Sequence, residues 1–492
     1  MTKPQFESYR YVGEICRLKS QSIVECRFAG SEMSTILAVQ ANAVPSESVC
    51  KDGEVQYGGK VSICVVYEDV DKKICRVERG VEFFHKTEGR EVNPSCFVKV
   101  AFDAQNVSWR REGSGLYLSV VVQADLTVYG GKQIEYFVGG EELISKRETM
   151  TICKNICVSG ETEGEDEFDT DYVGDVLLHG ENALVSKVVA SAGQLDIEGE
   201  IAVNICVLKE EEVCSYERLI PFKMQVPCEE AFGKVTASAC VKVKSAYLTA
   251  NTDEEAGKSK MILSYTLAAD CFVSAEEDLF IATDAFSLRE ELSLKRVKEG
   301  GRYLTKHVRT VERIGGVCTL SPELEGEYAL QAAVLPRAEL TFRKTENGWE
   351  AEGIAQAEVL LKGADGVKKS TLSLPFILPL DIEGDELEGE GIVCSLNVRR
   401  KKNGEMEAEG TFKCAVRSYE RREWEYVGEV IEGEKYPEEE CGFSVVMTGA
   451  GEDLWQVSKR LCCEPETLKK NNPDLVFPLK ERTKIYVYRQ SK

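Results

Sequence analysis

The side chains best suited to acid–base chemistry near neutral pH are the three histidines, His85, His179 and His307. They are far apart in the sequence, and none belongs to an H-E-x-x-H zinc motif. The chain also lacks the G-x-S-x-G turn of a serine nucleophile and the G-x-x-x-x-G-K-[ST] loop that binds phosphates. The sequence therefore nominates no catalytic residue.

Carboxylates are abundant enough to form chance pairs, such as Glu290 next to Glu291. A glycosidase needs two carboxyl groups placed on either side of a bound glycosidic bond. Adjacent acids in a strand-like segment fit a solvated face better than such a dyad, because exposed charges are well hydrated. An enzyme hidden elsewhere in the chain stays an open alternative that no motif supports.

Nineteen cysteines raise the question of metal sites and disulfides. No C-x-x-C pair occurs, and Cys462 and Cys463 are adjacent, a poor geometry for a zinc site. Many cysteines lie in apolar runs, such as Cys64 in VSICVVY, Cys206 in IAVNICVL and Cys240 in ASACVKV. We expect reduced thiols that pack as small apolar side chains, with no bound metal and no cofactor.

The formal net charge of −23 limits the partners of the chain. Such a surface repels phosphate, so we expect neither nucleic acid nor an anionic membrane face, and basic protein surfaces fit better. The first residues, MTKPQFESYRYVGEICRLK, show no apolar secretory segment, and no apolar run is long enough for a membrane span. The expectation is a soluble protein of the cytoplasm, without membrane insertion.

Three segments of the chain resemble one another. EELISKR at residues 141–147 recurs as EELSLKR at residues 290–296. An apolar run that begins with glycine occurs as GGKVSICVVY, GEIAVNICVL and GIAQAEVLL, at residues 58–67, 199–208 and 353–361. A related opening segment occurs as STILAVQANAV, NALVSKVVASAG and YALQAAVLPRAEL, at residues 34–44, 182–193 and 328–340.

Apolar residues within each segment recur with period two, as in LYLSVVVQADLTV at residues 116–128. Turns rich in Gly, Asn and Asp divide these runs, which is typical of antiparallel hairpins in all-β domains. The predicted fold is mainly β, with three β-sandwich-like repeats followed by a small α+β (βααβ) domain. The predicted domains are residues 1–149, 150–297, 298–435 and 436–492.

Two charged segments are predicted to connect structured parts of the chain. ETEGEDEFDTDYVGD, residues 161–175, is acidic and shows no clear period, so we interpret it as a solvated loop or linker rather than a binding tail. EGEKYPEEECG, residues 432–442, contains Pro437 and precedes the last unit. It marks the clearer domain boundary.

The C-terminal unit has the signals of strand, helix, helix and strand. FSVVM at residues 443–447 alternates as a short strand, and Asp453 with Gln456 predicts a capping box at a helix start. Leu454, Val457, Ser458 and Leu461 then share one helix face. A second helix is predicted from Pro465 to about Lys470, stopped by Asn471, Asn472 and Pro473, and KIYVYR at residues 484–489 closes the unit as a strand.

This C-terminal unit resembles a LysM domain, in which a strand and a Gly-Asp-Thr-Leu-Trp-like turn precede two helices, an Asn-Pro break and a closing strand. The three preceding units resemble the SPOCS domain of spore coat proteins. Together they are similar to the SipL-like family of clostridial spore morphogenetic proteins. The resemblance implies a non-enzymatic role in the mother cell, where such proteins help to encase the forespore with the basal coat layer. The implied partner is a coat morphogenetic ATPase of the SpoIVA kind, with other coat proteins as further candidates.

LysM domains bind glycans that contain N-acetylglucosamine in a groove between two loops. The resemblance therefore implies which residues form the corresponding site in this chain. The loops correspond to Gly451, Glu452, Asp453 and Leu454 and to Asn472, Pro473, Asp474 and Leu475. Asp453 replaces the usual threonine, and LKERTK replaces the usual Pro-Gly-Gln-like turn. These departures favour a surface that binds protein over one that binds sugar.

The predicted protein-docking surface is an apolar patch centred on Leu454 and Trp455 and on Leu475, Val476 and Phe477. For Trp455 two roles remain open, because tryptophan is common both in the cores of small domains and at binding hot spots. Two function classes also remain open for the unit: an adaptor that docks a protein, and a binder of peptidoglycan or chitin-type glycans in the cell wall or cortex.

Overall fold

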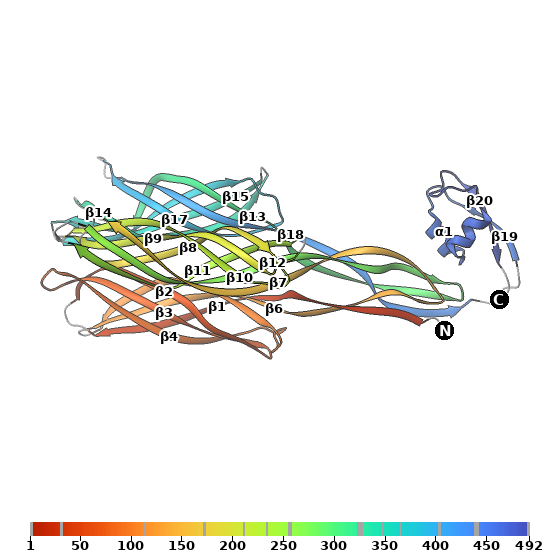
Figure 1. The fold of residues 1–492 in the computed structure, drawn as a ribbon, viewed down its shortest axis with the longest axis horizontal. Helices are drawn as coiled ribbons and strands as arrows, with labels where there is room; N and C mark the ends of the chain where they lie inside the picture. The colour runs from red at the N-terminus through yellow and green to blue at the C-terminus, as the bar shows by residue number, and fades with distance from the viewer. Residues whose placement is uncertain are drawn as a thin grey trace.

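A computed structural model provides the structure of the chain. It describes residues 3–29, 33–112, 115–170, 174–209, 212–232, 235–253, 258–321, 328–346, 348–364, 366–401, 405–436 and 442–489. These residues form twenty strands and two short helices, so the protein is mainly β, as predicted. Figure 1 shows a broad body of strands that narrows to a stalk, with the helices beyond the tip of the stalk.

Six consecutive strands form the first unit of the body, which we call unit 1. They are β1 (Lys3–Ala29), β2 (Met33–Lys51), β3 (Glu54–Asp69), β4 (Ile74–Glu88), β5 (Phe97–Glu112) and β6 (Gly115–Glu141). Two antiparallel sheets result, with strand orders β2-β3-β4 and β1-β6-β5.

The next twelve strands repeat this topology twice. Unit 2 contains β7 (Leu143–Thr170), β8 (Asp175–Ser191), β9 (Gln194–Lys209), β10 (Glu212–Pro227), β11 (Val235–Asp253) and β12 (Lys258–Ser287). Unit 3 contains β13 (Glu290–Ser321), β14 (Ala329–Thr345), β15 (Gly348–Gly363), β16 (Gly366–Leu380), β17 (Glu386–Arg400) and β18 (Met406–Lys435). In unit 3 the two sheets join through a short β13–β16 pairing, which gives the order β14-β15-β16-β13-β18-β17.

The strands form because apolar side chains recur at every second position and so gather on one face of a sheet. In the part of β6 that belongs to the sandwich, the alternating buried residues are Leu116, Leu118, Val120, Val122, Ala124, Leu126 and Val128. They pack against Val55 and Ile63 of β3, which lies in the opposite sheet. Units 2 and 3 have equivalent cores between their own two sheets. Each unit is therefore β-sandwich-like.

The repeated glycine-led runs occupy equivalent central strands, namely β3, β9 and β15. In unit 2, Gly199 pairs with Phe222, and a Cβ atom at position 199 would lie 2.3 Å from the phenyl ring. In unit 3, Gly353 pairs with Phe376, and a Cβ atom there would also lie 2.3 Å from the ring. Glycine is required because the aromatic ring covers the backbone of the neighbouring strand.

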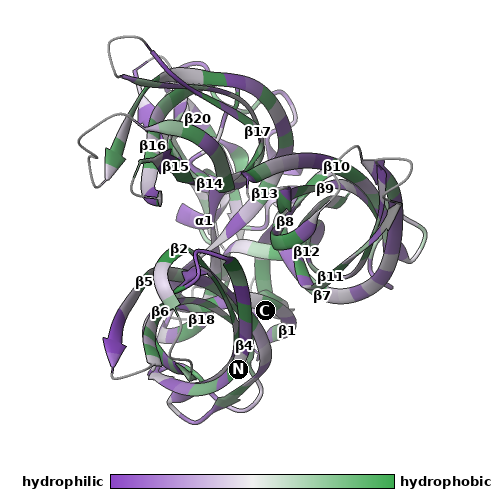
Figure 2. Cartoon of the chain, turned by 90° about the vertical axis from the view of Figure 1, so that its left-hand side faces the viewer, coloured by the Kyte–Doolittle hydropathy of each residue, from purple (hydrophilic) through white to green (hydrophobic). Residues whose placement is uncertain are grey.

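Figure 2, which looks along the molecule, shows the three units arranged around a common axis. An apolar cluster joins them there, with members from equivalent strands of every unit: Leu37, Ala38, Cys64, Val66, Leu177, Leu178, Cys206, Val213, Ala332, Val334 and Leu360. Cys64 and Cys206 thus pack as small apolar side chains, as predicted, while Cys240 is half-buried. The three units form one body because they share this cluster.

Six long strands continue beyond the sandwiches and form the stalk, which we define as residues 3–11, 132–141, 143–152, 277–287, 290–303 and 420–435. A strand such as β12, with 30 residues, spans up to roughly 100 Å at 3.3 Å per residue. The stalk has its own core, rich in aromatic side chains from all three units: Tyr11, Ile134, Tyr136, Met150, Ile152, Leu279, Ile281, Tyr303, Trp424 and Tyr426. A smaller cluster around Phe137 and Val427 fills the tip.

The predicted boundaries at 149/150 and 297/298 lie inside β7 and β13. The chain passes from one unit to the next near residues 142 and 288–289 instead. EELISKR contains the first of these turns and the start of β7, whereas EELSLKR follows the second turn and begins β13. The boundary at 435/436 coincides with the end of β18. The linker predicted at residues 432–442 is wrong for residues 432–435, which belong to β18 and pair with β13, and residues 437–441 are not among the described residues.

The acidic linker predicted at residues 161–175 is wrong for residues 161–170, which form the end of β7 and pair with β12. Residues 171–173 lie outside the described part of the chain. The acids occupy mainly the outward-facing positions of this strand, while Phe168 and Thr170 face the core and are buried. Glu161 pairs with Lys244, and Glu167 pairs with Lys260, so neighbouring cations balance the acidic face.

Candidate interaction site

The last part of the chain, which we call the tail, comprises residues 442–489. It contains β19 (Gly442–Thr448), α1 (Leu454–Arg460), α2 (Pro465–Asn471) and β20 (Thr483–Arg489), with β19 and β20 paired antiparallel. The predicted capping box is confirmed: Asp453 Oδ1 accepts the Gln456 N–H at 2.7 Å, and Gln456 Oε1 accepts the Asp453 N–H at 3.0 Å. Within the described residues, neither helix has the length and apolar character needed to span a lipid bilayer.

The two helices cover one face of the β19–β20 sheet and enclose a small core. Val457 and Leu461 of α1, Leu468 of α2, and Ile485 and Val487 of β20 are buried together. Leu454, Leu475 and Phe477, three residues of the predicted docking patch, pack against this core and are only half-buried at its edge. Their main role in the structure is to pack against the tail core rather than to form an open surface.

The loop around Glu452 is tied to the segment before β20. The Glu452 carboxylate accepts the Gly449 N–H at 2.8 Å and the Arg460 guanidinium at 2.8 Å. The Glu452 carbonyl accepts the Leu479 N–H at 3.0 Å, and the Leu479 carbonyl accepts the Gly451 N–H at 2.7 Å. The structure therefore brings the first predicted loop next to Leu479, four residues beyond the second predicted loop.

Asn472 is buried, with 5% of its surface exposed, and its side chain is fully used inside the tail. Its Nδ2 donates to the carbonyls of Leu468 and Tyr486 at 2.9 and 2.8 Å, and its Oδ1 accepts the Tyr486 N–H at 2.8 Å. The carboxamide links the C-terminal end of α2 to β20, and no polar group is left for a ligand. Its neighbours Pro473 and Asp474 are exposed.

Trp455 lies against the tip of the stalk. Its Nε1 donates to Asp284 Oδ2 at 2.8 Å, and its ring meets the edge of Phe286 at a centroid distance of 5.3 Å. Lys459, one helical turn further along α1, pairs with the same carboxylate of Asp284. Burial alone would raise the pKa of Asp284, but the bonds from Lys459 and Trp455 outweigh it and lower the pKa.

The predicted docking patch is thus divided among three places. Trp455 contacts the stalk, Leu454, Leu475 and Phe477 pack against the tail core, and Val476, 74% exposed, is the one fully exposed apolar member among these described residues. The division follows from size: so small a domain needs nearly every apolar side chain for its own core. These residues do not form one continuous exposed surface in the structure.

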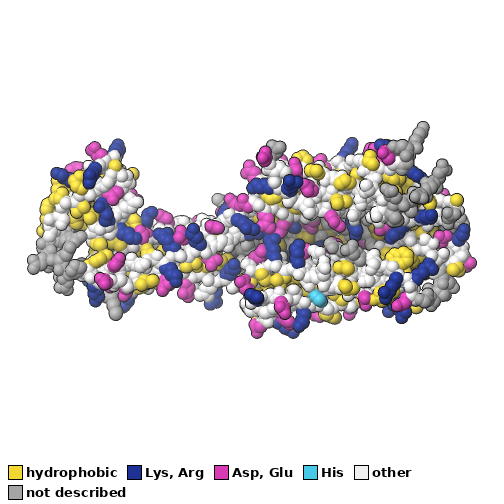
Figure 3. All heavy atoms as spheres, turned by 180° about the vertical axis from the view of Figure 1, so that it is seen from behind, with side chains coloured by type: hydrophobic (Ala, Val, Ile, Leu, Met, Phe, Trp, Pro, Cys, Tyr) yellow, Lys and Arg dark blue, Asp and Glu magenta, His cyan; other side chains and the backbone are white. Residues whose placement is uncertain are grey.

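A different apolar surface is exposed on the outer face of the β19–β20 sheet. We call it the outer sheet face and define it by Phe443, Val445, Met447, Tyr486 and Tyr488, which are 40–70% exposed, roughly. The register places Phe443 opposite Tyr488 and Val445 opposite Tyr486, so their side chains share one face. Figure 3 shows the tail at the end of the narrow stalk, with hydrophobic side chains on its surface.

The residue pattern of the two strands indicates this exposed apolar face. In FSVVM and KIYVY most residues at both phases of the period-two pattern are apolar, with Ser444 and Lys484 as the exceptions. A strand with one solvated face instead alternates apolar and polar residues. Ile485 and Val487 face the core, which leaves Tyr486 and Tyr488 for the outer side. Two apolar faces on a two-stranded sheet indicate a second packing partner.

The charge of the tail differs from that of the rest of the chain. The tail together with the three residues that follow it, residues 442–492, contains nine Lys and Arg against six Asp and Glu, a net charge of +3. The whole chain carries −23, so residues 1–441 carry −26. A basic tail with an apolar face fits a partner surface that combines apolar and acidic groups.

The three histidines lie in three different units. His85 meets the Tyr57 ring at 5.7 Å, and His179 Nδ1 lies 2.6 Å from Glu181 Oε1. His307 is held in the interior, where burial and then the charge of Arg417 lower its pKa to about 4. Within the described ranges, no group of three His, Cys, Asp or Glu side chains is placed to hold a metal ion.

Neither protein-family models, nor curated proteins, nor solved structures give a match to this chain. What the structure defines is a class of architecture: a strand-built body of three equivalent units, an aromatic-cored stalk, and a small basic tail with an exposed apolar sheet face. The function is inferred from that architecture together with the resemblance of the sequence.

Proposed function

We propose that the protein is a non-enzymatic structural adaptor of sporulation, which helps to localise the basal spore coat layer and to encase the forespore. In this proposal the tail is a LysM domain, the three units are SPOCS-type repeats, and the protein acts in the mother-cell cytoplasm at the forespore surface. The tail docks a coat morphogenetic ATPase of the SpoIVA kind.

The observation that carries the proposal is the outer sheet face. Its three apolar residues on β19 and two tyrosines on β20 lie on the opposite side of the sheet from the tail core and are not part of that core. Phe443 stacks on Tyr486 at a centroid distance of 5.8 Å, which holds both rings in place. Rigid aromatic side chains and methionine are enriched at protein interfaces because they bury a large area at low entropic cost.

The body supports an adaptor role in a second way. The three units share one apolar cluster, and the stalk extends the shared core towards the tail. Such a body is a stiff support that holds the tail away from the sandwiches, as Figure 1 shows. The contact of Trp455 and Lys459 with Asp284 lies on α1, on the opposite side of the tail sheet from the outer sheet face. The outer sheet face is thus left open to a partner.

The test is capture of the purified ATPase by the full-length protein. The double variant Phe443→Ser/Tyr488→Ser should lose at least tenfold in affinity, because hot-spot aromatic residues each contribute more than about 1 kcal/mol. Deletion of residues 442–492 should abolish capture. The matched control is Tyr247→Ser, which removes an aromatic side chain that is 69% exposed on β11 in the body.

Full capture by the shortened chain would refute docking through the tail. A loss of capture in Tyr247→Ser equal to that in the double variant would place the binding surface on the body instead. The same proteins incubated with chitin and peptidoglycan test the glycan alternative. Retention of the wild-type chain and release of the double variant would favour a glycan-binding function over the adaptor.

A further inference from the structure

A cavity of about 390 Å³ lies where the three units meet, at a distance from the tail in the sequence and in the fold. Its walls come from β2 and β5 of unit 1, β8 and β9 of unit 2, and β14 to β16 of unit 3. Small-molecule sites are commonly roughly 300–1,000 Å³ and lie between domains. The size and the place of the cavity match those of such a site.

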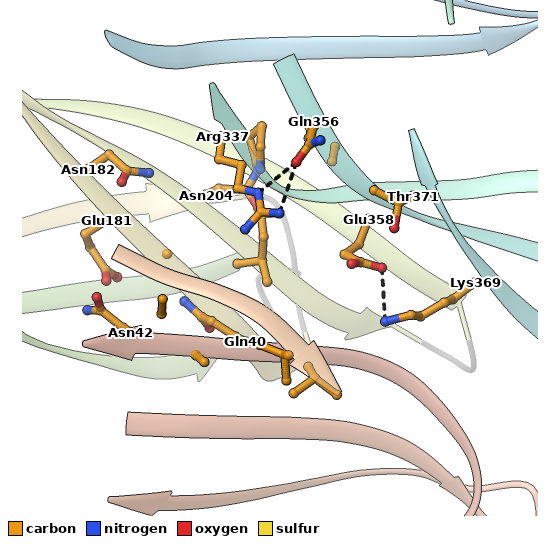
Figure 4. Close-up of a pocket in the computed structure, with 18 of the residues that line it drawn as sticks. Gln40, Asn42, Glu181, Asn182, Asn204, Arg337, Gln356, Glu358, Lys369 and Thr371 are labelled. Carbon is orange, nitrogen blue, oxygen red and sulfur yellow. Dashed lines mark hydrogen bonds and ion pairs between the residues drawn. The ribbon is translucent and has the colours of Figure 1, made fainter. Parts of the chain in front are cut away.

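Carboxamide groups dominate the polar wall. Figure 4 shows five of them around the cavity, contributed by all three units: Gln40, Asn42, Asn182, Asn204 and Gln356. A carboxamide both donates and accepts hydrogen bonds and carries no charge. This wall therefore suits a ligand with many hydroxyl groups, which also donate and accept.

The charged groups of the wall balance one another. Lys369 Nζ lies 3.2 Å from Glu358 Oε2. The Nη2 atom of Arg337 donates a hydrogen bond to Gln356 Oε1 at 3.0 Å. Glu181 is paired with His179 at 2.6 Å. Figure 4 shows the first two of these contacts at the rim of the cavity. The wall thus holds two carboxylates, Glu181 and Glu358, and two cations, Arg337 and Lys369. Their formal charges sum to zero, so the wall favours a neutral ligand over an ionic one.

Asn204 carries the observation that points most directly to a ligand. Its side chain is 7% exposed and lines the cavity, and its Oδ1 accepts the Leu335 N–H at 3.0 Å. That bond fixes the orientation of the carboxamide, and Nδ2 has no hydrogen-bond partner among the described residues. A buried donor without a partner is costly and rare. A hydroxyl oxygen of a bound molecule would complete it after a small shift of the cavity wall, because the Nδ2 atom itself is buried.

Trp109 of β5 adds an apolar surface to the same wall, and 43% of its side chain is exposed. The flat face of an indole packs well against the C–H face of a sugar ring, while its edge remains available to polar groups. We propose that this cavity binds a neutral mono- or disaccharide, with Asn204 Nδ2 donating to a hydroxyl group and Trp109 stacking on the ring. The site is separate from the tail and goes beyond the adaptor function.

Isothermal titration of the full-length protein with maltose, cellobiose, sucrose and di-N-acetylchitobiose tests the site, with glucose 6-phosphate as an anionic probe. We expect at least one of the neutral disaccharides to bind the wild type. Asn204→Asp keeps the acceptor for the Leu335 N–H and removes the free donor, so binding should weaken at least tenfold. Trp109→Ala should weaken it at least tenfold as well, because it removes the apolar surface of the cavity wall.

The matched control is Asn397→Asp, an exposed asparagine of β17 outside the cavity, which should bind like the wild type. Circular dichroism and the melting temperature show whether each variant is folded. The proposal is overturned if none of the four disaccharides binds the wild type, or if only glucose 6-phosphate binds. It is also overturned if binding is unchanged in folded Asn204→Asp and Trp109→Ala, because the sugar would then bind elsewhere, for example on the tail.

Discussion

At the scale of single residues, three side chains organise the tail: Asp453 caps α1, Asn472 joins α2 to β20, and Trp455 contacts the stalk tip. The capping box of Asp453 and Gln456 needs only three residues of spacing and one backbone conformation, and the structure confirms it. The role of Trp455 depends on Asp284, which is 171 positions away, so no local pattern indicates this bond. Asn472 resembles a loop residue in the sequence, yet it closes the tail core because both of its polar atoms find backbone partners.

Asn472→Ala should destabilise the tail rather than remove a ligand contact. The change leaves the Tyr486 N–H without its partner, and an unsatisfied buried group costs about 1–3 kcal/mol. Hydrogen exchange should show faster exchange of the α2 and β20 amides in the folded protein. The exposed neighbour Lys470→Ala is the control and should exchange like the wild type. Equal exchange in both variants would contradict the structural role.

Asp284→Ala should release the tail from the stalk tip. The variant removes the acceptor of Trp455 Nε1 and the partner of Lys459, and charge-assisted bonds of this kind contribute about 1.5–3 kcal/mol. Small-angle scattering should then give a larger maximum dimension and a broader distance distribution. Asp278→Ala, an exposed aspartate of the same strand, should leave the scattering curve unchanged. An unchanged curve for Asp284→Ala would show that other contacts hold the tail.

At the scale of elements, period-two patterns predict the strands well but not their lengths. The repeated runs predict the central strands β3, β9 and β15, whereas the stalk strands extend through charged segments that the sequence analysis assigns to linkers or boundaries. Residues 161–170 mislead because the acids that mark a linker also mark the outer face of a strand. The outer sheet face is missed for the converse reason: apolar residues at both phases resemble an ordinary buried strand.

Phe168→Ala tests the assignment of residues 161–170 to β7. In a solvated linker the substitution would be nearly neutral, but Phe168 is 5% exposed in the core of unit 2, where such a truncation costs about 3–5 kcal/mol. Denaturant unfolding should show this loss as a lower midpoint. Asp169→Ala, on the outward face of the same strand, should change the midpoint little. Equal midpoints for the two variants would favour the linker.

At the scale of the whole molecule, the three units are joined by ionic contacts as well as by the central cluster. Glu388 of unit 3 lies 3.0 Å from Arg17 of unit 1 and 2.8 Å from Arg302 of unit 3. Elsewhere, Glu200 of unit 2 lies 2.7 Å from Lys413 of unit 3. The sequence shows that the units are related, but it does not show how they pack, because the contacts between different units join residues more than 200 positions apart.

The contact around Glu388 predicts an acid-sensitive association of the units. Burial alone would raise the pKa of Glu388, but the charges of Arg302, Arg17 and Arg417 outweigh it and lower the pKa below the usual value. Its contribution to stability is therefore complete above about pH 4.3, the usual glutamate pKa, and is lost as the pH falls through the lowered pKa. Melting temperatures from pH 7 to pH 2 should fall more steeply in the wild type than in Glu388→Gln. Parallel curves would contradict this role.

The central claim is that the outer sheet face of the tail binds the partner, and photo-crosslinking tests it most directly. A crosslinking amino acid is placed at one of three exposed positions. Val445 is on the outer sheet face, Val476 is on the tail but outside that face, and Tyr247 is on the body. Cross-links to the coat morphogenetic ATPase in sporulating cells should form from position 445 and not from position 247. Cross-links from position 247 alone, or equally from all three positions, would contradict the account.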